Sequence, residues 1–323
     1  MEQKMTIGVV GLGLMGCSIT TCLIMADHPV VAVAPISGDM DTALGRVTTH
    51  LERSRQEGLI GKDPDHYLRK LTITEDYARL APCGLVIECT LENLEVKQTV
   101  FQKIESVISK ESLLTSNTSA IPISLLQKHT KHPERFFGLH WAEPSHTTRF
   151  LEVICGESSD ISKGEFLYAI SQGWGKEPTL VRKDIRGFIT NRLMYAMYRE
   201  AFHLVENGFA TVEDIDRACR NNPGYWMTLA GVFRWMDLTG IQAYHAVMKD
   251  LFPTLCNDTT VPKMIDDLVK AGAKGVANAH GFHEYTPEEA KLWEETFKTF
   301  SYEIRELALQ YPADVVKRKL KDK

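Results

Sequence analysis

The chain has 323 residues, a formal net charge of −5, and 44% hydrophobic and 24% charged residues. This composition is typical of a folded globular protein, and this length is typical of two domains rather than one. A net negative charge argues against a protein that works by neutralising nucleic-acid phosphates, so we expect no nucleic-acid partner.

The seven cysteines are scattered along the chain, and none forms a Cys-x-x-Cys pair. This spacing favours free thiols in a reducing compartment over a disulfide framework, and it gives no sign of a metal site. Glycines break the apolar start of the chain, unlike a secretory signal, and no run approaches the roughly 18 apolar residues of a membrane-spanning helix. We expect a cytoplasmic protein that binds no membrane.

The first half of the chain alternates short apolar runs with longer amphipathic ones, which is the pattern of repeated strand–helix units. It predicts an α/β domain with a doubly wound, mostly parallel sheet of the Rossmann type. The strands are expected at residues 5–10, 30–34, 84–89, 112–116 and 135–139.

Between the second and third of these strands, a helical hairpin is predicted to interrupt the sheet. Residues 40–59 place Leu44, Val47 and Leu51 on one helical face, and residues 64–71 are expected to form a second, shorter helix. The hairpin is therefore interpreted as an insertion into the Rossmann-type domain.

Two further strand-like segments, 149–154 and 177–182, precede a second half whose pattern is helical throughout. We place the domain boundary where this pattern begins, which gives domains 1–184 and 185–323. The second domain is expected to be all-α, with helices over 184–207, 212–221, 228–250 (either continuous or broken near Gly240), 261–271 and 287–310.

The last of these helices has the clearest start. Thr286 is a favourable N-cap, proline stands at the first helical position, and glutamates follow in the first turn. Trp226, Met227 and Trp235 are expected in the core between the helices, and the charged tail 317–323 is expected to fray.

A glycine-rich turn follows the first strand and opens a helix, with Gly-x-Gly-x-x-Gly at residues 11–16. In this context the three glycines allow a tight turn, the approach of a pyrophosphate and close packing of helix on strand, while the helix N-terminus attracts phosphate. The alternative is a turn that serves packing alone. The predicted cofactor site consists of Gly11, Gly13, Leu14, Met15 and Gly16.

The end of the second strand lacks the acidic residue that normally binds the adenosine ribose hydroxyls. Ala34 stands in its place, which removes a charge-assisted hydrogen bond worth about 1.5–3 kcal/mol. Asp39, Asp41 and Ser37 are candidates to replace it. Because no Arg or Lys lies beside Ala34 to bind a 2′-phosphate, we expect NAD rather than NADP as cofactor.

Polar side chains follow three successive strands, at the edge where open parallel sheets bind ligands. Twelve residues beyond the last of them, Glu152 places a carboxylate in an otherwise apolar strand. Each of these residues also has a plainer explanation, such as a surface histidine, a solvated ion pair or a helix cap. The residues at the three strand ends are Glu92 and Lys97, Asn117 and Ser119, and His140.

In these motifs the chain resembles the 3-hydroxyacyl-CoA dehydrogenase family, and the resemblance extends through both halves. It implies that His140, in a Gly-Leu-His stretch, is the catalytic histidine and that Glu152, in Leu-Glu-Val, is the glutamate paired with it. It also implies that Ser119 contacts the 3-oxygen of the substrate and that Asn191 helps to hold the substrate.

The same resemblance places Glu92 and Lys97, in the motif Glu-Asn-x-x-x-Lys, on the nicotinamide side of the cofactor. Asn117 is a further candidate on that side. The helical half resembles domains that form dimers in this family, so we expect a homodimer. The resemblance also implies a role in fatty acid metabolism.

The chemistry of the residues agrees with these implications. Oxidation of a secondary alcohol needs a base for the hydroxyl proton as hydride leaves, and histidine titrates near neutrality. A carboxylate on the second ring nitrogen fixes the tautomer and stabilises the imidazolium. His140 and Glu152 suit these two tasks, whereas His129, His132 and His146 are interpreted as loop or surface histidines.

Two departures from the family pattern leave the substrate open. Glu143-Pro144 stands where the family has Asn-Pro, and the segment after Gly224-Tyr225 is altered. The predicted substrate is a small molecule, first a short-chain 3-hydroxyacyl-CoA and alternatively a free 3-hydroxy acid resembling carnitine or gulonate. A non-catalytic relative that only binds the cofactor is the remaining hypothesis.

Overall fold

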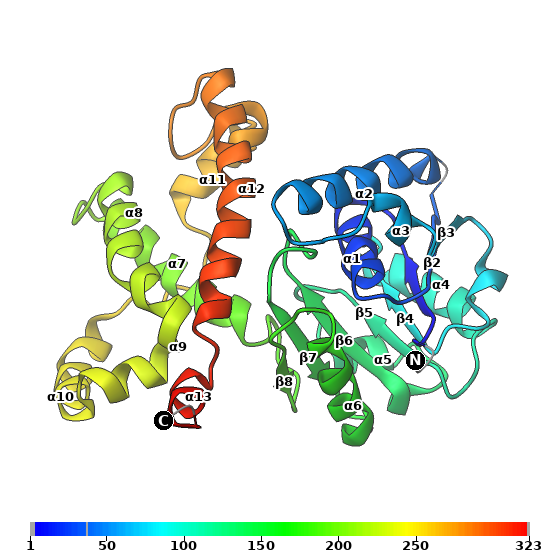
Figure 1. Ribbon diagram of the computed structural model, residues 1–323. Coiled ribbons are helices and arrows are strands. Elements are labelled where there is room, and N and C mark those ends of the chain that lie inside the picture. Colours follow the sequence, from blue (N-terminus) through cyan, green and yellow to red (C-terminus); the bar gives the residue numbers. More distant parts are fainter. Residues whose placement is uncertain (1–3, 37, 322–323) are drawn as a thin grey trace. The chain divides into compact units, whose positions relative to one another are not determined.

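The computed structural model describes residues 4–36 and 38–321, and its contacts divide the chain into two compact units. Unit 1 ends at Asn191 and unit 2 begins at Arg192. Figure 1 shows strands and helices in unit 1 and helices in unit 2. The predicted fold class, a Rossmann-type domain followed by a helical one, is confirmed.

Unit 1 is built on one eight-stranded sheet with the order β3-β2-β1-β4-β5-β6-β7-β8. All neighbouring strands are parallel except β6 and β7, which are antiparallel. The strands are β1 (Ile7–Val10), β2 (Val30–Val33), β3 (Leu71–Thr74), β4 (Leu85–Glu88), β5 (Leu113–Ser116), β6 (Phe136–Trp141), β7 (Leu151–Cys155) and β8 (Thr179–Val181).

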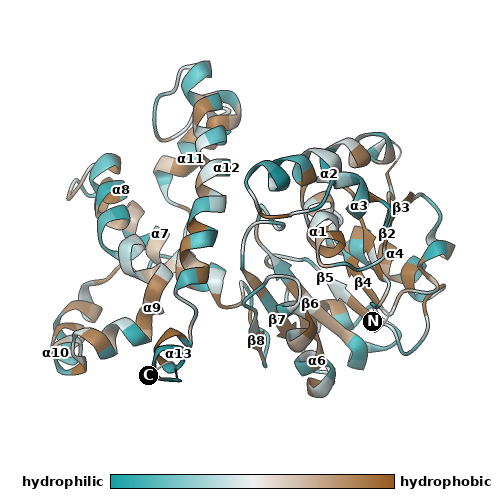
Figure 2. Ribbon diagram, viewed as in Figure 1, coloured by the Kyte–Doolittle hydropathy of each residue, from teal (hydrophilic) through white to brown (hydrophobic). Residues whose placement is uncertain are grey.

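Each face of the sheet has its own apolar core, as expected for a sheet covered by helices on both sides. One core joins the sheet to α1 (Leu14–Met25), α2 (Asp39–Gln56) and α6 (Ile161–Gln172), and the other joins it to α4 (Leu94–Glu105) and α5 (Ile123–Gln127). Figure 2 shows much of α2 in the polar colours, whereas brown apolar segments recur in the strands.

The predicted helical hairpin is a crossover connection and does not interrupt the sheet. After α2, the helix α3 (Pro64–Leu68) ends earlier than predicted, and β3 pairs in parallel with β2 at the edge of the sheet. The strand β3 was not among the predicted strands, because its Leu-Thr-Ile-Thr sequence is short. In the structure it is only half-buried. A crossover of this kind is the standard link between parallel strands.

The buried face of α2 differs from the predicted one by one position. Val47 and Leu51 are buried together with Ala43, whereas Leu44 is 51% exposed. Residues three and four apart both share a face, so positions 43 and 44 each fit beside 47 and 51, and the helical period alone does not decide between them.

Unit 2 is helical, although its first helix begins at Thr190 instead of at 184 and its third at Pro223 instead of at 228. The helix α12 opens with a complete capping box between Thr286 and Glu289. The break at Gly240 is present and Gly231 adds a second non-helical position; residues 317–321 of the tail are helical instead of frayed, and 322–323 lie outside the described residues. The helices are α7 (Thr190–Glu206), which begins in unit 1, α8 (Val212–Asn221), α9 (Pro223–Thr239), α10 (Ile241–Leu251), α11 (Lys263–Lys270), α12 (Pro287–Gln310) and α13 (Val315–Lys321).

The tryptophans of α9 do not form the core that the sequence analysis predicted. Trp226 and Trp235 stack with ring centroids 5.1 Å apart, but both are only half-buried, and Met227 is exposed. No described side chain of α7, α8, α9, α10 or α11 is fully buried. Unit 2 therefore leaves much apolar surface open.

Two glycines of the turn after β1 are expected to respond differently to alanine. A Cβ at Gly16 would lie 1.7 Å from the carbonyl oxygen of Gly11, so Gly16→Ala must displace the backbone, at a cost of about 3 kcal/mol or more. A Cβ at Gly13 would meet no atom within 4 Å. Thermal unfolding should show a large loss of stability for Gly16→Ala and little change for Gly13→Ala; equal melting temperatures would contradict this geometry of the turn.

Candidate active site

The turn between β1 and α1 has the backbone that a dinucleotide site needs. Gly11 has a φ of 101°, a left-handed conformation that favours glycine. Gly13 precedes α1 without a side-chain cap, so the first N–H groups of the helix remain available to an anion. Leu14 is exposed and Met15 is half-buried beside them. The turn thus presents an open, positively polarised helix start.

A charged residue of α2 reaches the same turn. Arg46 Nη1 donates a hydrogen bond to the carbonyl oxygen of Leu12 at 3.2 Å. Burial raises the pKa of the Cys17 thiol in the first turn of α1, and the charge of Arg46 opposes this rise. Sequence reasoning named Asp39 but missed Arg46, which has no motif to mark it. Ser37 lies outside the described residues.

At the end of β4, a buried ion pair joins two segments of the site. Lys97 Nζ lies 3.0 Å from both carboxylate oxygens of Glu88, and both side chains are almost fully buried. Glu88 also accepts hydrogen bonds from Ser116 Oγ at 2.6 Å and from the backbone N–H of Thr90 at 2.6 Å. Glu88 was missed, although a carboxylate that ends a wholly apolar strand is a signal the sequence offered.

Glu92 holds the segment that follows β5. One of its carboxylate oxygens accepts hydrogen bonds from Thr118 Oγ1 at 2.5 Å and from the backbone N–H of Ser119 and Ala120 at 3.0 and 3.1 Å. The other oxygen lies 3.4 Å from Lys97 Nζ. Ser119 does not cap a helix, because α5 follows Pro122 and has no side-chain cap; the Thr118 hydroxyl accepts the N–H of Ile121 in the turn before α5.

The antiparallel pairing of β6 with β7 brings His140 and Glu152 together. The two residues are direct partners in the strand register, and His140 Nδ1 lies 2.8 Å from Glu152 Oε2. Glu152 is fully buried and His140 nearly so. A carboxylate can only accept a hydrogen bond, so it places the ring proton on Nδ1 and leaves Nε2 as the acceptor.

The second oxygen of Glu152 anchors the start of α7. It accepts hydrogen bonds from the backbone N–H of Ile189 at 3.1 Å and of Thr190 at 3.0 Å. Burial by itself would raise the pKa of this carboxyl, but the hydrogen bonds from His140, Thr190 and Ile189 together hold its pKa below the usual range. Glu152 is therefore a carboxylate at neutral pH.

Aromatic rings and amides complete the surroundings of the His140 ring. The rings of Phe150 and Phe188 lie 5.4 and 5.6 Å from it, centroid to centroid. Asn191 Nδ2 donates to the backbone oxygen of Ser119 at 2.8 Å, so the end of β5 and the start of α7 meet here. The fold thus brings His140, Glu152, Ser119 and Asn191 into one linked network.

Asn117 has a structural task within this network. Its Oδ1 accepts the backbone N–H of Trp141 at 3.0 Å, and its own N–H donates to the backbone oxygen of Glu88 at 2.8 Å. Asn117 therefore ties together the ends of β4, β5 and β6.

Beyond β6, Glu143 and His146 are buried more deeply than the sequence suggested. Burial raises the pKa of Glu143, and hydrogen bonds with Ser18 and the N–H of Ser145 offset this only in part. His146 is buried, with Nδ1 3.0 Å from Ser18 Oγ, and its ring stacks on that of His50. His146 lies in a loop, which is one of the two interpretations given to it, but it is not a surface histidine, because the loop after β6 folds back onto α1.

The raised pKa of Glu143 predicts a pH-dependent stability difference for Glu143→Gln. Below about pH 4 the carboxyl is neutral in both folded and unfolded states, and the variant and wild type should be similar. As pH rises toward 7, the wild type must bury a charge on folding, so the variant should unfold at the higher temperature. Melting curves from pH 4 to 8 measure this; Glu52→Gln, on the exposed side of α2, is the control. If the difference in melting temperature between Glu143→Gln and wild type shrinks as the pH rises, the raised pKa of Glu143 is contradicted.

Two family models together match most of the chain, up to residue 285. The model described as "3-hydroxyacyl-CoA dehydrogenase, NAD binding domain" matches residues 6–185, and the one described as "3-hydroxyacyl-CoA dehydrogenase, C-terminal domain" matches residues 187–285. This fold, together with a histidine paired with a buried glutamate, is typical of nicotinamide-dependent dehydrogenases. The chain belongs to the 3-hydroxyacyl-CoA dehydrogenase family and is an NAD-dependent oxidoreductase.

Relatives within this family act on different substrates. The chain is 32% identical over 288 residues to 5-formyl-3-hydroxy-2-methylpyridine 4-carboxylate 5-dehydrogenase of Mesorhizobium japonicum, covering 88% of this chain and 92% of that one. A crystal structure of an enzyme of that name, described as an NAD+-dependent dismutase, has a TM-score of 0.89 at 28% identity, covering 96% of this chain and all of the other.

A structure of (S)-3-hydroxybutyryl-CoA dehydrogenase from Ralstonia eutropha has a TM-score of 0.73 at 27% identity, with 88% of this chain and 99% of that one covered.

Within residues 4–36 and 38–321, no helix combines the length and the apolar character that crossing a membrane requires.

Proposed function

We propose that the protein transfers a hydride between NAD and the 3-hydroxy or 3-oxo carbon of a hydroxyacyl substrate, with His140 as acid–base residue. The observation that carries this proposal is the 2.8 Å contact of His140 Nδ1 with the buried Glu152, which leaves Nε2 to face a substrate. In this proposal Ser119 and Asn191 help to hold the substrate oxygen.

The turn after β1 fits the diphosphate of NAD. The left-handed Gly11, the open space at Gly13 and the uncapped start of α1 let a phosphate approach the backbone, and Leu14, Met15 and Gly16 belong to this turn. We propose that Arg46 binds the same diphosphate and that Asp39 binds the adenosine ribose hydroxyls. Glu92, Lys97 and Asn117 shape the nicotinamide side, with Lys97 held by Glu88.

The chain's own residues provide the proton chemistry. NAD, when bound, supplies the hydride acceptor or donor. In the oxidation, His140 Nε2 takes the hydroxyl proton, and Glu152 stabilises the imidazolium that forms. In the reduction, the same imidazolium returns the proton to the oxygen. Because Glu152 also anchors Ile189 and Thr190, the ring is held in place through both directions.

The first candidate substrate is a short-chain 3-hydroxyacyl-CoA, and in that case a role in fatty acid metabolism follows. The family models and the likeness to a 3-hydroxybutyryl-CoA dehydrogenase support it.

The second candidate is a free acid without CoA. The higher TM-score to the pyridine-carboxylate dehydrogenase, over the whole length of that chain, favours it. So does Glu143, which replaces an amide three residues after His140 and creates a different hydrogen-bonding group beside α1.

A spectrophotometric assay of NADH tests the function and separates the candidates. Purified protein is given NAD or NADP with 3-hydroxybutyryl-CoA, 3-hydroxybutyrate, carnitine, gulonate or the 5-formyl pyridine carboxylate. We expect NAD-dependent turnover with one of them, and His140→Ala should lower kcat by about 10²–10⁴-fold because the proton acceptor is lost.

His129→Ala, at an exposed position after α5, is the matched control and should retain activity. Full activity of His140→Ala would refute the acid–base role. Tight NAD binding without turnover of any substrate would favour the non-catalytic alternative.

We further propose that residues 1–184 form the NAD-binding domain of a cytoplasmic homodimer, and that 185–323 form the substrate and dimerisation domain. Unit 2 exposes large apolar side chains on several helices, among them Tyr225 at 80% and Phe233 at 78%. Exposed apolar patches mark protein–protein interaction sites, and we propose that a second copy of the chain covers these side chains.

Light scattering after size-exclusion chromatography should give the mass of two chains at micromolar concentration. Phe233→Asp should shift the equilibrium toward the monomer, since a carboxylate would have to be buried in the interface. Phe166→Asp, on α6 of unit 1, is the control and should leave the mass unchanged. A wild-type mass equal to one chain would refute the homodimer.

A further inference from the structure

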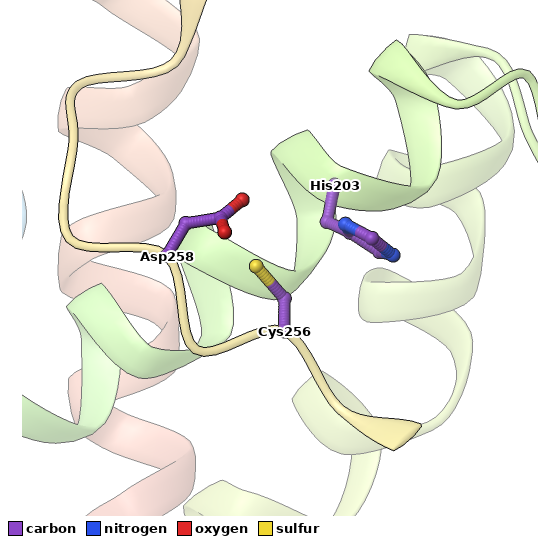
Figure 3. A group of neighbouring side chains, drawn as sticks. All are labelled: His203, Cys256 and Asp258. Carbon is purple, nitrogen blue, oxygen red and sulfur yellow. The ribbon is translucent and has the colours of Figure 1, made fainter.

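Three potential metal ligands of different chemistry meet in unit 2. They are the imidazole of His203 on α7 and the side chains of Cys256 and Asp258 in the loop before α11. One ligand atom from each lies within 4.8 Å of the other two. Figure 3 shows the Cys256 thiol and the Asp258 carboxylate close together beside the helix that carries His203. The dehydrogenase chemistry uses none of the three.

Two carboxylates of α7 accept backbone hydrogen bonds from the chain on either side of this cluster. Glu200 Oε2 accepts the backbone N–H of Cys256 at 2.8 Å, and Glu206 Oε1 accepts the backbone N–H of Met264 at 2.7 Å. Glu200, His203 and Glu206 are spaced three residues apart, so they share one face of the helix. Two hydrogen bonds to the backbone therefore hold the loop against α7 and keep the three ligands near one another.

We propose that His203, Cys256 and Asp258 bind a structural Zn²⁺ ion. A thiolate, an imidazole and a carboxylate are the three ligand types that Zn²⁺ takes in proteins, and this borderline-soft ion accepts all three together. Water can occupy the fourth position. Hard cations such as Mg²⁺ prefer oxygen ligands only, so they fit this set poorly.

Binding requires the three side chains to close on the ion. Tetrahedral Zn²⁺ with ordinary bond lengths separates such ligand atoms by about 3.4–3.6 Å, so separations of up to 4.8 Å must shorten by up to about 1.4 Å. Asp258 is exposed, and His203 and Cys256 are half-buried, which leaves the side chains room to rotate. A long hydrogen bond of 3.3 Å from Asn207 Nδ2 to His203 Nδ1 is the contact that would relax.

Such an ion would stabilise a unit that has little core of its own. Among the described residues of unit 2, only Ala290, Ser301 and Tyr302 are buried. Zn²⁺ would link α7 to the segment before α11 by bonds that the unfolded chain lacks, which adds directly to folding stability. Binding releases the Cys256 thiol proton to solvent, so affinity must fall at acid pH.

The test uses the full-length chain without a histidine tag, stripped with EDTA and titrated with Co²⁺ as a spectroscopic probe for the Zn²⁺ site. We expect one Co²⁺ per chain, a sulfur-to-cobalt charge-transfer band, and its displacement by Zn²⁺. Zn²⁺ should also raise the melting temperature of the stripped protein. Cys256→Ser should lose the band, and His203→Gln should weaken binding at least tenfold.

Matched controls lie in the same unit: Cys219→Ser on α8 and His245→Gln on α10 should bind as wild type does. Circular dichroism checks that each variant folds. Affinity weaker than micromolar in wild type, or a band retained in Cys256→Ser, would overturn the proposal, the latter outcome marking an adventitious ion. His140→Ala should still bind Co²⁺, so this result is independent of the dehydrogenase assay.

Discussion

The bond between His140 and Glu152 is the interaction on which the site depends, because Glu152 serves two elements at once. One oxygen orients the imidazole at the end of β6, and the other accepts two N–H groups at the start of α7. A buried carboxylate is stable only when its oxygens are paired, and here both pairings serve the site. The orientation of the His140 ring is thus coupled to the position of the first residues of α7.

A second buried carboxylate repeats this arrangement at the end of β4. Glu88 ends β4 and is neutralised by Lys97 from the following helix, while Ser116 at the end of β5 donates to it. Burying an ion pair contributes little net stability, but removing one partner leaves an uncompensated charge that costs several kcal/mol. Glu88 and Lys97 therefore fix the relative positions of two strand ends and the segment 90–97 more than they stabilise the fold as a whole.

The sequence predicted those parts of the structure that follow from local pattern. The strands before and after the glycine turn, the start of α12 at Thr286 and the pairing of His140 with Glu152 come from periodicity, capping and a family motif. The edge strand β3, the depth of His146 and the reach of Arg46 to Leu12 depend on contacts across the fold. No local signal encodes them, because α2, α3 and the loop after β6 acquire their partners only when the sheet assembles.

Glu143 lies in the loop that joins β6 to β7, the strands that carry His140 and Glu152. As an anion it would repel a nearby carboxylate of a free acid or the phosphates of a CoA ester in surroundings of low dielectric. Burial raises its pKa, which weakens it as an acid, and a protonated carboxyl can donate a hydrogen bond as the amide in the family pattern does. The substitution is therefore compatible with an anionic substrate, whereas the anionic Glu152 is shielded by His140 and the start of α7.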